Sequence, residues 1–215
     1  LIDASSSMNY ASGKVSKLEY AKYLAASLAY MVLRQRDSVG LSIFDSEVRA
    51  YLPPRSSMGI IMEIDRLLRN VKPTSRTSIA KQLHDIALMI KRRSLVVLVS
   101  DLFSDVDDIL AGLDHLRFNG HDVVVLHTLD PHELEFPFKG AWCFEGLEEE
   151  VPLTTQADRI QGEYLTNFNK YMESLRDGCV ASQIDYTTVN TALPLDDVLS
   201  EFIVKRQAVL NGGRG

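Results

Sequence analysis

The sequence has 215 residues, of which 46% are hydrophobic and 24% charged, and its 23 basic and 29 acidic residues give a net charge of −6. This composition is typical of a globular protein with a substantial core. The net negative charge and the absence of a stripe of basic residues argue against nucleic acid or an anionic membrane as the main partner. No apolar run approaches the roughly 18 to 20 residues that span a bilayer, so we expect no membrane contact by this segment.

The two cysteines, Cys143 and Cys179, lie far apart in the sequence and form no C-x-x-C motif. Cysteines without such a motif or a disulfide framework are typical of a reducing compartment. We therefore expect a cytoplasmic protein in which both thiols are reduced and fill the core.

The apolar pattern alternates between short strands and longer helices. A first strand ends at Asp3, and because a strand typically has about five or six residues, we expect it to begin upstream of Leu1. Pro53 and Pro54 suit the end of a short edge strand. The further elements expected are a helix from Val15, strands at 38–45 and 47–54, helices at 60–70 and from 79, a strand at 94–101, a helix at 106–117, a strand at 122–130, an irregular stretch at 131–155, a helix at 158–182, a strand at 184–190 and a helix at 193–207. Within the irregular stretch, the acidic run at 145–151 is expected as a turn between two short strands.

Strands that alternate with long helices predict an α/β fold. Its sheet is expected to be mostly parallel, covered by helices on both faces, with one short antiparallel edge strand. We find no internal repeat and no linker, and so expect a single domain over residues 1–207 and a disordered tail at 208–215. Such sheets bind ligands at the carboxyl ends of their strands, near the switch in strand order. Polar residues at that edge are therefore the first candidates for a functional site.

Oxygen-bearing side chains occur at that edge in three segments. Asp3, Ser5 and Ser7 follow the first strand with D-x-S-x-S spacing, and alternate residues of an extended loop point to the same side. Thr77 lies in a loop before a helix, and Asp101 closes the most apolar strand. Hard cations such as Mg²⁺ prefer oxygen ligands. These five residues therefore predict a Mg²⁺ or Mn²⁺ site.

Each segment also has a simpler structural interpretation. Serine and aspartate after a strand are common as helix caps and turn residues, and Thr74 is an alternative to Thr77. The acids at 105–108 fit the first turn of a helix. The histidines within 121–132 are spaced poorly for a metal site, and we expect them in turns or at the edge of the core.

The segments "DASSSM", "TSRTS" and "VLVSD" resemble the metal-ion-dependent adhesion site of von Willebrand factor A domains. The wider sequence, including "LVVLVSDLFSD" and "GHDVVVLHTLDPHELEFPF", resembles one bacterial branch, the domain of unknown function fifty-eight. Genes of this family sit beside those of MoxR-type AAA+ ATPases. The resemblance runs from residue 1 to about residue 205. It implies a von Willebrand factor A-like (Rossmann-like) fold.

The resemblance implies that Asp3, Ser5 and Ser7 are first-loop metal ligands. It also implies that Thr77 is the second-loop ligand and that Asp101 often acts through a water. Family members usually carry a glycine shortly before this threonine, but "PTSRTS" has none. The choice between the two threonines of the loop therefore stays open.

The resemblance also implies a protein–protein contact, in which an Asp or Glu of a partner completes the metal shell. The partner would be a MoxR-type ATPase or its client, and the role would be chaperone-like or in assembly. A divalent-metal-dependent interaction module is therefore the main functional hypothesis.

Two other functions are compatible with the sequence. One is a structural domain of this fold without a functional metal site. The other is a metal-dependent phosphohydrolase that uses Asp3 and Asp101. The sequence has no G-x-x-x-x-G-K-[ST], G-x-G-x-x-G or G-x-S-x-G motif, and it supplies no nucleophile with a base. We therefore expect no enzymatic activity.

Overall fold

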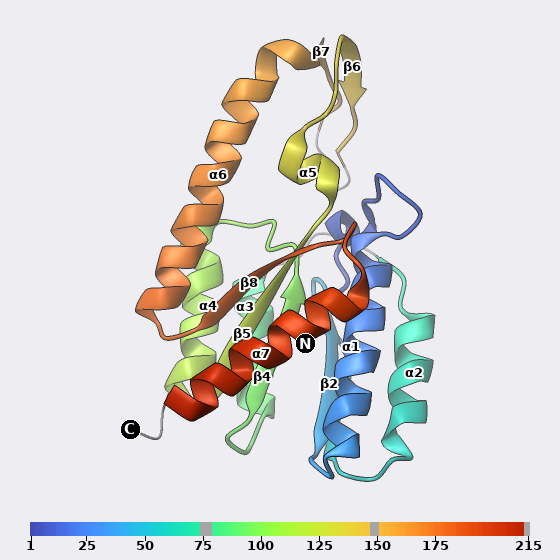
Figure 1. The fold of residues 1–215 in the computed structure, drawn as a ribbon, viewed down its shortest axis with the longest axis vertical. Coiled ribbons are helices and arrows are strands. Elements are labelled where there is room, and N and C mark those ends of the chain that lie inside the picture. Colours follow the sequence, from blue (N-terminus) through green and yellow to red (C-terminus); the bar gives the residue numbers. More distant parts are fainter. Residues whose placement is uncertain (74–78, 147–150, 213–215) are drawn as a thin grey trace.

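The computed structural model describes residues 1–73, 79–146 and 151–212. A six-stranded sheet forms its centre, in the strand order β3-β2-β1-β4-β5-β8 (Figure 1). Neighbouring strands are parallel except β2 and β3, which are antiparallel. The predicted α/β class and its antiparallel edge strand are therefore confirmed. The strands of this sheet are β1 (Ile2–Asp3), β2 (Val39–Phe44), β3 (Val48–Arg55), β4 (Leu95–Ser100), β5 (Asp122–Leu129) and β8 (Asp185–Asn190).

Helices cover both faces of this sheet (Figure 1). They are η1 (Ser6–Asn9, a 3₁₀ turn), α1 (Lys17–Arg34), α2 (Ile60–Asn70), α3 (Ile79–Met89), α4 (Val106–Phe118), α6 (Ala157–Ala181) and α7 (Leu195–Gly212). The helices α1, α2 and α7 share one apolar core, and α3, α4 and α6 share the other. Within the described residues, no helix combines the length and apolar character needed to cross a membrane.

The central strand β5 is apolar on both faces. Val124 and Leu126 belong to one core, and Val123 and Val125 to the other. Because consecutive side chains of a strand point to opposite faces, only a nearly unbroken apolar run can be buried on both sides. Toward its carboxyl end this run gives way to buried polar residues, beginning with His127.

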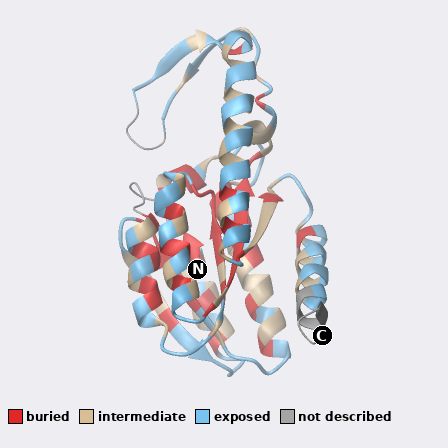
Figure 2. Cartoon of the chain, turned by 90° about the vertical axis from the view of Figure 1, so that its left-hand side faces the viewer, coloured by how far each residue is buried: buried red, intermediate tan, exposed pale blue. Residues whose placement is uncertain are grey.

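A second, two-stranded sheet lies beyond the carboxyl edge of the first (Figure 1). Its strands, β6 (Ala141–Phe144) and β7 (Leu153–Gln156), are antiparallel, and α5 (Pro131–Glu135) connects β5 to β6. With the first turns of α6 they form a projection that is mostly exposed (Figure 2). We call this projection the aromatic lobe. Its side chains are joined by ring contacts among Phe136, Phe138, Trp142, Phe144 and Tyr164.

Three local features differ from the expectations. The strand β3 continues through Pro53 and Pro54, because a register shift in its pairing with β2 falls at this point and an edge strand tolerates proline at such irregularities. Cys143 is exposed and does not fill the core, whereas Cys179 is buried as expected. The helix α7 ends at Gly212 and so includes part of the segment expected as a tail.

Candidate functional site

The strands β1 and β4 lie side by side at the middle of the sheet. The chain passes from β1 to β2 on one side, and β4 lies on the other side, so the strand order switches between β1 and β4. Open α/β sheets bind ligands at such a switch, in the crevice at the carboxyl ends of the strands. Asp3 is the last residue of β1, and Asp101 directly follows β4. Both side chains are buried. Two carboxylates with little access to water therefore lie at the point of the sheet where a ligand is expected.

The carboxylate of Asp3 is held in a fixed orientation. The Ser5 main-chain N–H donates to Oδ1 at 2.9 Å, and the Ser100 hydroxyl donates to Oδ2 at 2.6 Å. Burial and, secondly, the nearby charge of Asp101 raise the pKa of Asp3 to about 6, although hydrogen bonds from Ser100 and Ser5 act in the opposite direction. A cation beside these two acids would relieve their repulsion.

The hydroxyls of Ser5 and Ser7 face each other beside this carboxylate. Ser5 precedes η1 as its N-cap, but its side chain makes no capping hydrogen bond. Instead, the two Oγ atoms lie 3.0 Å apart, and both residues are buried. Octahedral Mg²⁺, with bonds of about 2.0–2.1 Å, places neighbouring ligands about 2.9 Å apart. The two hydroxyls are hydrogen-bonded to each other at this distance, and the same separation suits adjacent ligand positions on such an ion. Ser5 does not cap η1 through its side chain.

Asp101 forms a buried ion pair with Lys17, the first residue of α1. The Lys17 ammonium lies 2.7 Å from Oδ2 of Asp101 and 2.5 Å from Oε1 of Glu133 on α5. Lys17 is only 1% exposed. Burial by itself would lower the pKa of Lys17, but the charges and hydrogen bonds of the two acids outweigh it and raise this pKa above its ordinary value. The positively charged Lys17 side chain therefore links the start of α1 to the segments that follow β4 and β5, through its ion pairs with Asp101 and Glu133.

Lys17, Glu133 and Ser100 were not among the predicted site residues. A lysine in the first turn of a helix is repelled by the positive end of the helix dipole. This unfavourable position indicates that Lys17 needs an acidic partner, and it could have identified the residue from the sequence. Glu133 belongs to a capping box with Asp130, which is a sufficient structural reason for an acid at its position. Ser100 directly precedes the predicted ligand Asp101 within the segment "VLVSD", and this adjacency is its one signal in the sequence.

The main chain of Asp101 is hydrogen-bonded to the side chain of His127 on β5. The Nε2 atom of His127 lies 2.8 Å from the Asp101 carbonyl oxygen, and its Nδ1 atom lies 2.5 Å from the Tyr186 hydroxyl. Burial lowers the pKa of His127 to about 4, so the ring is neutral at physiological pH. Tyr171 donates to the carbonyl oxygens of Leu102 and Ser104 in the same loop. These contacts make His127 part of the core that fixes the loop.

The predicted second-loop ligand, Thr77, and its alternative, Thr74, lie outside the described residues. The structure therefore brings together four of the five predicted site residues at one edge, Asp3, Ser5, Ser7 and Asp101. Among the residues that the structure describes, no group of three or more His, Cys, Asp or Glu side chains is arranged to hold a metal ion. The candidate site instead depends on two carboxylates together with hydroxyl groups.

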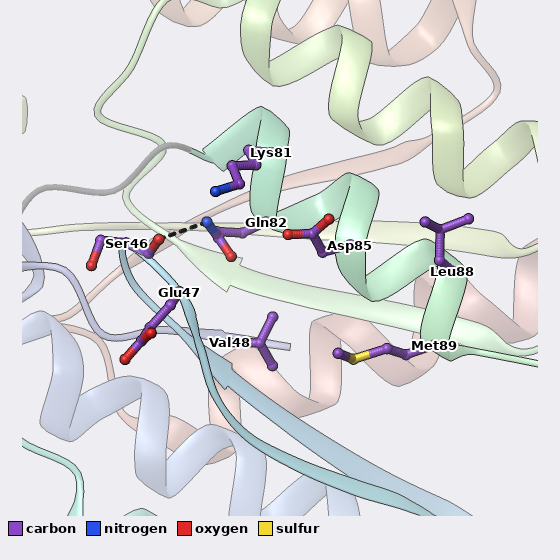
Figure 3. Close-up of a pocket in the computed structure, with 8 residues that line it drawn as sticks. All are labelled: Ser46, Glu47, Val48, Lys81, Gln82, Asp85, Leu88 and Met89. Carbon is purple, nitrogen blue, oxygen red and sulfur yellow. Dashed lines mark hydrogen bonds between the residues drawn. The ribbon is translucent and has the colours of Figure 1, made fainter.

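A shallow pocket of about 380 Å³ lies elsewhere, between the start of β3 and α3 (Figure 3). Glu47, Lys81 and Asp85 bring charges of both signs to its rim, and the Gln82 amide donates to the Ser46 carbonyl oxygen. This pocket is wide open to solvent. It lacks the convergent, buried polar groups that distinguish the edge with Asp3.

The fold and this edge define a Rossmann-like α/β domain with buried acids and hydroxyls at its switch point. The chain belongs to the family described as "Protein of unknown function DUF58", whose family model matches residues 1–173. This confirms the family that the sequence resembles. No curated protein matches the chain.

Among the solved structures that match the chain, two show the shared fold over nearly their whole length. The conserved hypothetical protein BatB from Bacteroides thetaiotaomicron gives a TM-score of 0.62 at 17% identity, with 95% of each chain covered. An aerotolerance-related membrane protein from Bacteroides fragilis NCTC 9343, carrying multiple mutations to serines, gives a TM-score of 0.63 at 20% identity. That match covers 95% of this chain and 96% of the other. At these identities the similarity concerns the fold alone.

Proposed function

We propose that this chain is a von Willebrand factor A-like domain that binds Mg²⁺ or Mn²⁺ through Asp3, Ser5, Ser7 and Asp101. The observation that carries this proposal is the hydroxyl pair beside a buried carboxylate, with the two Oγ atoms 3.0 Å apart. This separation matches neighbouring positions on an octahedral ion. A threonine of the 74–78 segment is proposed as a further ligand.

We propose that the bound ion recruits a protein partner. Mg²⁺ in proteins usually keeps several waters, and an Asp or Glu of a partner would replace one of them. The site lies at the carboxyl edge of the parallel sheet, where the loops after the strands gather and where such sheets bind their ligands. The identity of the partner, a MoxR-type AAA+ ATPase or its client, rests on the family resemblance. So does the chaperone-like or assembly role.

We further propose that the domain is not an enzyme and that it works in the cytoplasm. Catalysis by Ser5 or Ser7 would need a base, and the hydrogen bonds of His127, the buried histidine of β5, go to the Asp101 carbonyl oxygen and the Tyr186 hydroxyl. Both cysteines are free thiols, which fits a reducing compartment. One structural neighbour is described as a membrane protein, and a membrane attachment outside these residues does not conflict with this proposal.

One observation favours the alternative of a purely structural domain. Lys17 already neutralises Asp101, so this acid is compensated by the protein itself. In that case Asp3, Ser5 and Ser7 would form only an internal hydrogen-bond network. The two functions differ in whether a divalent ion binds to the carboxylate of Asp3.

Calorimetric titration of Mg²⁺ and Mn²⁺ into the parent chain and into Asp3→Asn tests the proposal. We expect saturable binding to the parent and its loss in the variant, because Asn keeps the shape of the side chain but removes its charge. Asp122→Asn is the matched control, since Asp122 begins β5 at the opposite edge and pairs with Arg117. Equal binding to the parent and to Asp3→Asn would contradict the proposed site.

A further inference from the structure

We propose that Lys17 is a tethered cation that competes with the divalent ion for the carboxylates of this edge. On this view Lys17 weakens metal binding, so that the ion is held firmly only when a partner contributes another carboxylate. The inference rests on the metal site proposed above and concerns how that site is regulated.

The position of Lys17 is the first argument. Its ammonium contacts Oδ2 of Asp101 at 2.7 Å and Oε1 of Glu133 at 2.5 Å, and the side chains of Lys17 and Asp101 are almost fully buried. The other oxygen of Glu133 accepts from the Asp130 main-chain N–H at 2.8 Å. The ammonium therefore lies between an acid that follows β4 and an acid of α5, and it neutralises Asp101 without any metal.

The charge at the edge is the second argument. Asp3, Asp101 and Glu133 are acids, and Lys17 is the base in contact with two of them. Without the lysine, the buried carboxylate of Asp101 would have no cation in contact with it and would attract a divalent ion more strongly, because charges at short range in a poorly hydrated site interact strongly. With it, the charge of Asp101 is already compensated inside the protein. Lys17 thus determines how strongly the site attracts a divalent ion, and with it how much the ion depends on a carboxylate from a partner.

A different role for Lys17 would be to position Asp101 for metal binding. The two roles predict opposite results when the lysine is removed. A competing cation predicts tighter metal binding without Lys17. A positioning residue predicts that Asp101 moves and metal binding is lost.

The test is a series of variants that change the charge of the edge in single steps. Lys17→Met makes it one unit more negative, Glu133→Gln makes it one unit less negative, and the double variant leaves it as in the parent. Lys22→Met is the control, because Lys22 lies on the same helix but pairs with Glu19 at the surface. Mn²⁺ affinity is measured for each full chain at neutral pH by calorimetry and by electron paramagnetic resonance of free Mn²⁺.

We expect Lys17→Met to bind Mn²⁺ at least about tenfold more tightly than the parent, and Glu133→Gln about tenfold more weakly. The double variant and Lys22→Met should stay within about threefold of the parent. Loss of Mn²⁺ binding in both Lys17→Met and the double variant would overturn competition and show positioning instead. If Lys17→Met does not fold, Glu133→Gln and the double variant decide, since positioning predicts parent-like affinity for the first and none for the second.

The outcomes also separate this inference from the proposed function. Binding to the parent that is lost in Asp3→Asn but unchanged in Lys17→Met would keep the metal site and overturn the inference alone. Absence of Mn²⁺ binding in the parent and in every folded variant of the series would overturn the proposed function and the inference with it. Binding that appears only in Lys17→Met would support the inference directly.

Discussion

The carboxyl edge and the aromatic lobe are neighbouring regions that are stabilised by different interactions, buried charged and polar contacts in the first and contacts between aromatic rings in the second. At the edge, buried polar groups meet over long sequence distances, since Lys17 and Asp101 are 84 positions apart. In the lobe, aromatic rings between Phe136 and Tyr164 contact one another within one segment. Trp142 is exposed, whereas Phe136 is buried. The two regions are joined through Glu133, which pairs with Lys17 and whose carbonyl oxygen accepts from the Tyr164 hydroxyl.

This difference teaches where each region is vulnerable. Charges buried at the edge depend on their partners, because an unpaired buried charge is costly. Rings of the lobe share many small contacts, so the loss of one ring weakens the lobe without leaving a charge unpaired. We therefore expect single changes to be more harmful at the edge than in the lobe.

Removing the ammonium of Lys17 should have the largest effect on stability. Lys17→Met leaves Asp101 and Glu133 without their cation, and breaking a buried ion pair in this way costs about 3–5 kcal/mol. Urea unfolding followed by circular dichroism measures this loss. Lys22→Met, which removes a surface pair, should cost no more than about 1 kcal/mol. Equal losses in the two variants would contradict the importance assigned to burial.

Removing a ring from the lobe should have a smaller and more local effect. Phe138 contacts His132, Phe136, Trp142 and Phe144 through its ring, and we expect Phe138→Ala to cost about 1–2 kcal/mol. Trp142 is the single tryptophan, so its fluorescence reports on the lobe, whereas circular dichroism reports mainly on the main body.

The fluorescence transition of Phe138→Ala should move to lower urea concentration while the circular dichroism transition stays nearly unchanged. Phe118→Ala is a suitable control, because Phe118 is a highly exposed ring outside the lobe. If both transitions moved together by the same amount, the lobe and the main body would form one cooperative unit.

Chemical labelling of the two cysteines compares the lobe with the rest of the domain without any change to the sequence. Cys143 is exposed in the lobe, and Cys179 is buried in the main body. Burial raises the pKa of Cys179 to about 11, so at pH values below this its thiol carries little of the reactive thiolate. We expect a thiol reagent to label one cysteine per folded chain at pH 8 and both in urea. Labelling of both thiols at equal rates in the folded protein would contradict this arrangement.

Much of the fold could be predicted from the sequence because it depends on local patterns. The helix at 60–70 and the strands that became β4 and β5 were placed within one or two residues, since apolar spacing distinguishes periods of 3.6 and 2. The aromatic lobe was expected as an irregular stretch with two short strands on either side of 145–151, and β6 and β7 confirm these two strands. The bounds of the strands were not predicted, because each has four residues, too short for a period to show.

The sequence by itself determined the acids and hydroxyls of the candidate site, because the D-x-S-x-S spacing after a strand and the acid after a central strand are local features. Only the tertiary structure decided what surrounds them. Lys17 begins α1, Asp101 follows β4 and Glu133 lies on α5, and their contact exists only once β1, β4 and β5 lie in one parallel sheet. A long-range ion pair has no sequence period, so its presence at the edge follows from the assembled fold.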